Sequence, residues 1–226
     1  MKTKTTGYVL SEQNGVVCVV TGFQGSENPK TGDMLQSYIL IAGVDPVTAA
    51  RTGEEWRVCG DCPLRDGRCY AQRFQAPASV WRKQKRGGYL PIDWTALKTH
   101  SIRIGSFGDP AFVPRAVWEQ VVKHCAGFIG YTHQWRRPEA QYLREYLMAS
   151  VDSPAEQREA VAAGWRTFRV RTPDQPLLAG EMVCPASDEA GHRTKCDKCL
   201  FCCGRSKRGK SVAIYAHGRR ATKFDL

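Results

Sequence analysis

A cluster of cysteines near the C-terminus has the spacing of metal ligands. Two residues separate Cys196 from Cys199 and Cys199 from Cys202, and Cys203 follows directly. Such spacers let successive thiolates face one ion, and zinc prefers four ligands in a tetrahedron. Cys184 or a histidine is available as a further ligand. We therefore expect structural zinc here, with one of the two adjacent cysteines left out, and keep an iron–sulfur cluster and incidental thiols as alternatives.

A second cysteine group contains Cys59, Cys62 and Cys69 and has no local fourth ligand. We expect metal binding here too, either with Cys184 recruited from across the fold or at a second, separate site, because glycines in this stretch permit tight turns. Three cysteines beside a barrel are also found in enzymes that cleave S-adenosylmethionine. Their usual CxxxCxxC spacing differs from the CxxC and distant third cysteine seen here, which disfavours that interpretation. Cys18 and Cys125 lie in apolar runs and are expected in the core.

Two aspartates each lie between an expected strand and an expected helix. Asp109 lies in the string GSFGDP, and Asp152 lies in MASVDS. Either carboxylate could be only a helix N-cap, because aspartate is among the best caps. Two carboxylates at one mouth of a fold can instead supply a nucleophile and a general acid/base. Displacement at a sugar C1′ requires such a pair.

Further polar and aromatic residues are expected at the same mouth. His133 lies in GYTHQW, where Tyr131 and Trp135 could stack on a nucleobase, although a packed aromatic cluster with a hydrogen-bonded imidazole explains the string equally well. Gln24 and Ser106 also follow or end expected strands.

The elements that must position these residues alternate along the chain. Apolar, β-branched or aromatic runs predict eight strands, at 16–22, 37–42, 102–107, 128–132, 146–151, 167–171, 181–185 and 211–216. Helices are expected at 114–126 and at 154–163, the latter with Ser153 as its N-cap and Glu156 completing a capping box. The alternation favours a compact (β/α)8 barrel, with a doubly wound open sheet as the alternative. We expect one domain over 1–226, with cysteine-rich insertions at about 57–75 and 184–210.

Composition narrows the class of protein and its partner. The chain has 226 residues, 42 % of them hydrophobic and 10 % aromatic, which is too rich for disorder, and it has no apolar run long enough to span a membrane. The N-terminus has no secretory-signal pattern, so we expect a reducing cytoplasm. The net charge of +11 favours a polyanion, with nucleic acid first, and basic residues gather at 79–90 and 193–223.

Several strings resemble a family of small phage-encoded proteins, the DNA 7-deazaguanine transglycosylases, which are distant relatives of the tRNA-guanine transglycosylases. They are NPKTGDM at 28–34, CGDCPL at 59–64, GSFGDPAFVP at 105–114, GYTHQW at 130–135, MASVDS at 148–153, GWRTFRV at 164–170 and CPAS at 184–187. The resemblance implies a (β/α)8 barrel with structural zinc. It also implies that the protein acts in the cytoplasm of a phage-infected bacterial host.

Carried over by residue, the resemblance implies that Asp109 and Asp152 are the catalytic pair, with Asp152 as the nucleophile. We expect Phe23, Gln24, Ser106, Phe107, Tyr131 and His133 to bind substrate. The zinc pattern differs from that of the tRNA enzymes, which use CxCxxC followed by a distant histidine, whereas this chain has CxxCxxC and an additional cysteine group. Gly22-Phe23-Gln24 is similar to a base-binding GGFQ, but Thr21 stands where that motif has an aspartate.

The function expected is replacement of guanine in DNA by a 7-deazaguanine derivative, such as preQ0, through a covalent aspartate–sugar intermediate. The target nucleotide must be unstacked for its C1′ to be reached. Two alternatives belong to other classes. One is a zinc-dependent nucleic-acid-binding protein without catalysis, and the other is an iron–sulfur or radical S-adenosylmethionine enzyme.

Overall fold

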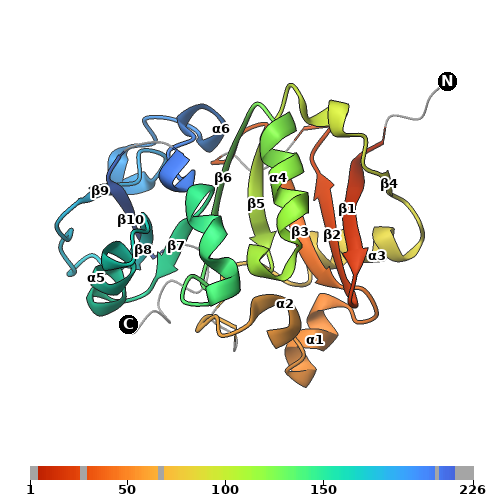
Figure 1. Ribbon diagram of the computed structural model, residues 1–226, viewed down its shortest axis with the longest axis horizontal. Helices are drawn as coiled ribbons and strands as arrows, with labels where there is room; N and C mark the ends of the chain where they lie inside the picture. The colour runs from red at the N-terminus through yellow and green to blue at the C-terminus, as the bar shows by residue number, and fades with distance from the viewer. Residues whose placement is uncertain (1–4, 26–29, 66–68, 207–208, 217–226) are drawn as a thin grey trace.

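The computed structural model describes residues 5–25, 30–65, 69–206 and 209–216. The expected insertions, the NPKTGDM string and the basic segments at the C-terminus therefore lie partly outside the described residues. The described part is a mixed α/β structure built on one ten-stranded, mostly parallel sheet (Figure 1). The strand order is β4-β1-β2-β3-β5-β6-β7-β8-β10-β9.

All eight expected strand segments form strands: β2 (Val16–Thr21), β3 (Leu35–Ile41), β5 (Ser101–Phe107), β6 (Gly127–Thr132), β7 (Met148–Val151), β8 (Thr167–Arg171), β9 (Glu181–Val183) and β10 (Ser211–Tyr215). Two others, β1 (Gly7–Gln13) and β4 (Leu90–Pro91), were not expected. Neighbouring strands from β3 to β9 run parallel, whereas β2 pairs antiparallel with both β1 and β3. Among the described residues no pairing joins β4 to β9, so the closed barrel is not shown.

Both expected helices form, as α4 (Arg115–His124) and α5 (Pro154–Ala162). Ser153 caps α5, because its hydroxyl accepts from the Glu156 N–H at 3.2 Å. The Glu156 carboxylate accepts in return from the Asp152 N–H at 2.8 Å, which completes the predicted box one residue earlier than expected.

The other helical segments were not among the expected helices. They are α1 (Pro46–Thr52), α2 (Trp56–Cys59), α3 (Ala76–Lys85), α6 (Cys196–Cys199) and the 3₁₀ turns η1 (Trp94–Leu97), η2 (Pro110–Phe112), η3 (Pro138–Glu145), η4 (Asp188–Ala190) and η5 (Gly204–Ser206). In Figure 1, α1 and α2 lie together at the end of the sheet where β3 finishes. Among the described residues, no helix is long and apolar enough to cross a membrane.

The two faces of the parallel strands have different surroundings. Along β5, Ile102 and Ile104 join the main core, which also contains Trp118 and Val121 of α4. Arg103 and Gly105, which alternate with them, line a cavity on the opposite face. The expected core residue Cys18 is fully buried, and Cys125 packs against the same core.

Candidate active site

The cavity has a volume of about 400 Å³ and lies on the face of the sheet opposite α4. It is lined by residues of β5, β6 and β8 and by described residues between α2 and α3. The polar, aromatic and sulfur-bearing residues that line it are Lys30, Thr31, Glu55, Cys59, Cys62, Arg65, Cys69, Tyr70, Arg73, Arg103, Ser106, Phe107, Asp109, Tyr131, His133, Ser150, Phe168 and Cys196. Pockets of this size hold ligands as large as a nucleotide.

Asp109 lies at the wall of this cavity, directly after β5, and is 6 % exposed. Gly108 (φ 75°) allows this placement, because a Cβ there would lie 2.5 Å from the Ile39 carbonyl oxygen. Asp109 Oδ1 accepts from the Ala111 N–H at 3.0 Å and from the Thr132 hydroxyl at 2.7 Å. Burial raises the pKa of this carboxyl, and these hydrogen bonds oppose the rise only in part.

His133 connects Asp109 to Asp152. Its backbone N–H donates to Asp109 Oδ2 at 2.8 Å, and its Nε2 lies 3.3 Å from Asp152 Oδ2. Burial lowers the pKa of the imidazole, but the neighbouring Asp152 carboxylate and Cys62 thiol raise it more, so the pKa lies well above 6.5. The Asp152 oxygens have no well-aligned hydrogen-bond donor among the described residues, so the imidazolium is their main electrostatic partner.

Asp152 itself is not on the cavity wall, although Ser150, two residues earlier on β7, is. The carboxylate lies behind His133 and holds its ring. This arrangement resembles the base and orienting acid of many enzymes that transfer protons, with His133 at the cavity wall.

The first cysteine group lies on the same wall. Cys59, Cys62 and Cys69 all line the cavity, and their charges influence one another. Burial raises the pKa of both Cys59 and Cys69. The Asp109 N–H donates to the Val58 carbonyl at 2.7 Å, which joins this segment to the aspartate.

The second cysteine group is distinct and includes Cys184. Cys184, Cys196, Cys199 and Cys202 line a smaller cavity of about 30 Å³, whereas Cys203 does not. Burial raises the pKa of Cys184 and Cys196, and it raises that of Cys202 to about 12. The residue types and spacing suit zinc. As they stand, however, no three Cys, His, Asp or Glu side chains among the described residues are arranged to hold a metal ion.

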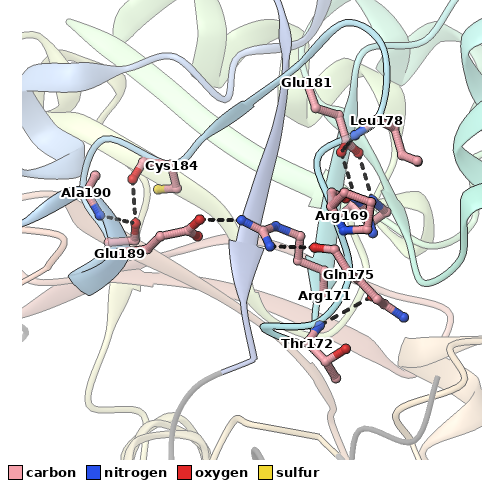
Figure 2. Close-up of polar contacts among 11 residues, drawn as sticks. Arg169, Arg171, Thr172, Gln175, Leu178, Glu181, Cys184, Glu189 and Ala190 are labelled. Carbon is pink, nitrogen blue, oxygen red and sulfur yellow. Dashed lines mark hydrogen bonds and ion pairs between the residues drawn. The ribbon is translucent and has the colours of Figure 1, made fainter.

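Buried ion pairs hold the segment that leads to Cys184 (Figure 2). Arg169 of β8 donates to both oxygens of Glu181 at 2.8 and 2.7 Å, with both side chains buried. Arg171 pairs with Glu189 and donates to the Gln175 carbonyl at 2.7 Å. These contacts fix both ends of the loop that carries Cys184, and sequence patterns gave no sign of them.

Not all of the expected substrate residues reach the cavity. Ser106, Phe107, Tyr131 and His133 line it. Phe23 instead packs against Tyr8 and His100, with ring centroids 5.1 and 5.2 Å apart, and neither Phe23 nor Gln24 lines the cavity. The reason is that β2 runs antiparallel to β3, which puts its carboxyl end at the opposite edge of the sheet.

Comparisons with protein-family models, with curated proteins and with solved structures find no match for this chain.

Proposed function

We propose that the protein exchanges guanine in DNA for a 7-deazaguanine derivative. The observation that carries the proposal is the chain of contacts from Asp109 through His133 to Asp152 beside a cavity of nucleotide size. The aromatic rings of Tyr131 and Phe168, whose centroids are 4.1 Å apart, offer a wall for a base. The net charge of +11 suits DNA.

The positions of the two aspartates suggest a role for each. Asp109 faces the cavity, and among the described residues its Oδ2 accepts a single hydrogen bond, from the His133 N–H, so a lone pair remains for attack on C1′. Asp152 faces His133 and is the positioning residue. This reverses the assignment of Asp152 as nucleophile that the resemblance implies.

The exchange then has two balanced steps. Asp109 attacks C1′ of deoxyguanosine, the C1′–N9 bond breaks, and the departing guanine takes a proton from His133. The incoming 7-deazapurine returns its N9 proton to His133 and attacks C1′, and the carboxylate of Asp109 leaves. One glycosidic bond is broken and one is formed, so no external energy source is required.

The proposal includes a closed barrel as the fold and zinc as a structural metal. The cavity face, which is lined by residues of β5, β6 and β8, is compatible with the inner wall of a compact (β/α)8 barrel. Zinc would be held by Cys184, Cys196, Cys199 and Cys202 in a structural role, after small movements of the thiols. Zinc there would stabilise the C-terminal segment, and no step of the exchange uses it.

A second candidate is an iron–sulfur enzyme of the radical S-adenosylmethionine type. The observation in its favour is that Cys59, Cys62 and Cys69 line the larger cavity, where a cluster would face substrate. Anaerobically purified protein with a brown colour and stoichiometric iron would support this candidate. Colourless, iron-free protein with exchange activity would exclude it.

The exchange is tested by mass spectrometry of DNA nucleosides after incubation with protein and a panel of 7-deazapurines. Asp152→Asn and Asp109→Asn are the site variants, and Asp174→Asn, at an exposed loop position, is the matched control. The wild type and the control are expected to form a deazaguanine nucleoside, and the site variants to form it at least about 100-fold more slowly. Undiminished exchange by both site variants would contradict the proposal.

A further inference from the structure

One cation of the cavity stands apart from the reacting groups. Arg103 projects from β5 onto the cavity face, four residues before Phe107. Asp109 lies two residues beyond the end of β5, so a ligand that contacts both Arg103 and Asp109 extends along this strand.

The other described arginines of the cavity are bound to other groups of the chain. Arg73 pairs with the Glu55 carboxylate and also donates to the Arg65 carbonyl. Arg65 donates to the Gly60 carbonyl at 2.6 Å. Their donors are therefore largely used by the loop that carries the first cysteine group.

Arg103 has a different environment. Its guanidinium donates to the Tyr70 hydroxyl oxygen and lies 5.8 Å from the centre of that ring. Among the described residues it forms no ion pair with a carboxylate. Arg103 is only partly buried and its contact with Tyr70 is open to solvent, so the guanidinium is accessible to an anionic ligand that enters the cavity.

The surroundings of Arg103 select the kind of anion. The Tyr70 O–H remains free to donate a hydrogen bond of its own, because its oxygen serves as the acceptor for Arg103. Ile129, Tyr131 and Phe168 supply an apolar and aromatic wall in the same cavity. A ligand that suits both features carries a flat ring and an anionic oxygen group.

We propose that Arg103 and Tyr70 bind a phosphate oxygen of a nucleotide whose base lies against Tyr131 and Phe168. Arginine suits this role because its planar guanidinium donates two parallel hydrogen bonds to phosphate. The inference rests on the proposed function for the identity of the nucleotide. Its source is either a free mononucleotide or a phosphodiester of a DNA strand.

Binding to the full-length protein, measured by isothermal titration calorimetry without turnover, tests this proposal. The probes are deoxyguanosine, deoxyguanosine monophosphate and a trinucleotide with guanosine at its centre. The variants are Arg103→Gln, Arg103→Lys and Tyr70→Phe. Arg115→Gln is the control, because Arg115 is exposed on α4 and pairs with Glu119 within that helix.

The wild type and Arg115→Gln are expected to bind the phosphorylated probes about 10- to 100-fold more tightly than the nucleoside. Arg103→Gln is expected to remove this preference without weakening deoxyguanosine binding. Arg103→Lys should restore part of the preference, and Tyr70→Phe should reduce it. If Arg103→Gln weakens binding of the mononucleotide alone, the natural ligand is a free nucleotide. If it also weakens binding of the trinucleotide, the ligand is a DNA phosphodiester.

Equal binding of nucleoside and nucleotide by the wild type would overturn the proposal. It would also be overturned if Arg103→Gln kept the preference and lost metal, since Arg103 would then act as a countercharge for the nearby Cys196. Thermal unfolding of each variant identifies any that fail to fold, and the lysine and phenylalanine variants then carry the test. Phosphate binding in a protein that exchanges no base would refute the proposed function alone.

Discussion

His133 Nε2 lies 3.3 Å from Asp152 Oδ2, and the backbone N–H of the same histidine donates to Asp109 at 2.8 Å. The two aspartates follow β5 and β7, and the histidine follows β6, which pairs with both strands. Three consecutive parallel strands thus bring together residues that are 24 and 19 positions apart in the chain. This meeting point at their carboxyl ends is the basis of the proposed chemistry.

Replacing Asp152 by asparagine should reduce base exchange about 10²- to 10⁴-fold, because the imidazole loses the charge that orients it and holds its proton. DNA affinity should stay unchanged, since it depends mainly on phosphate contacts. Initial rates by mass spectrometry and affinities by fluorescence anisotropy measure the two effects. Equal losses of rate and affinity would mean that Asp152 supports binding instead of catalysis.

Replacing Asp109 by asparagine should destabilise the fold by about 1–3 kcal/mol at neutral pH. An asparagine cannot accept all three of the hydrogen bonds that the carboxylate accepts, so one buried donor is left unpaired. Urea unfolding gives the difference. A variant as stable as the wild type would show that these donors find other partners.

The stability cost of ionising Asp109 has a defined sign. Its pKa is raised in the folded state, so the folded protein holds this proton more tightly than the unfolded chain does. Stability should therefore fall as the pH rises from about 4, the ordinary aspartate value, to the raised pKa, and should then level off. This contribution is isolated by measuring the unfolding free energies of the wild type and of Asp109→Asn across this pH range and subtracting the second from the first. A difference that increased with pH over this range would contradict the buried location.

Purified protein is expected to contain about one zinc per chain, held by the second cysteine group. Cys199→Ser should lose the metal and unfold at a lower temperature. Cys203→Ser is the matched control, because this thiol does not line the small cavity. Elemental analysis gives the zinc content of both variants. Zinc retained by Cys199→Ser would count against this ligand set.

Glu181→Gln should destabilise the protein by about 3–5 kcal/mol, because it leaves Arg169 buried without its counter-charge. Glu159→Gln breaks a solvent-exposed pair with Arg136 and should change stability little. Urea denaturation of the two variants tests the contrast. Similar small effects would mean that water reaches Arg169.

The strands could be predicted from the sequence because apolar and β-branched runs mark them, and all eight expected segments are strands. β1 was not predicted because about half of GYVLSEQ is polar, and β4 was not predicted because it is only two residues long. Strand direction is not encoded in such runs. The antiparallel direction of β2 moved Phe23 away from the cavity, although the local sequence was interpreted correctly as a strand followed by a turn.

The site was predictable where it depends on strand ends. Asp109 and His133 meet at the carboxyl edge, as expected for parallel strands. Arg103 was missed because an alternating Ser-Ile-Arg-Ile pattern normally indicates a solvent-exposed face, whereas that face here lines a cavity. The Arg169–Glu181 pair was missed because its partners lie on different strands, and charge alone does not reveal burial.

Base exchange is the central claim, and analysis of nucleosides from treated DNA tests it most directly. The account predicts a deazaguanine nucleoside, with an equal amount of guanine released, in reactions of the wild type and Asp174→Asn. It predicts that Asp152→Asn forms both products at least about 100-fold more slowly. Tight DNA binding with no exchange for any 7-deazapurine of the panel would contradict the account and favour a protein that binds DNA without modifying it.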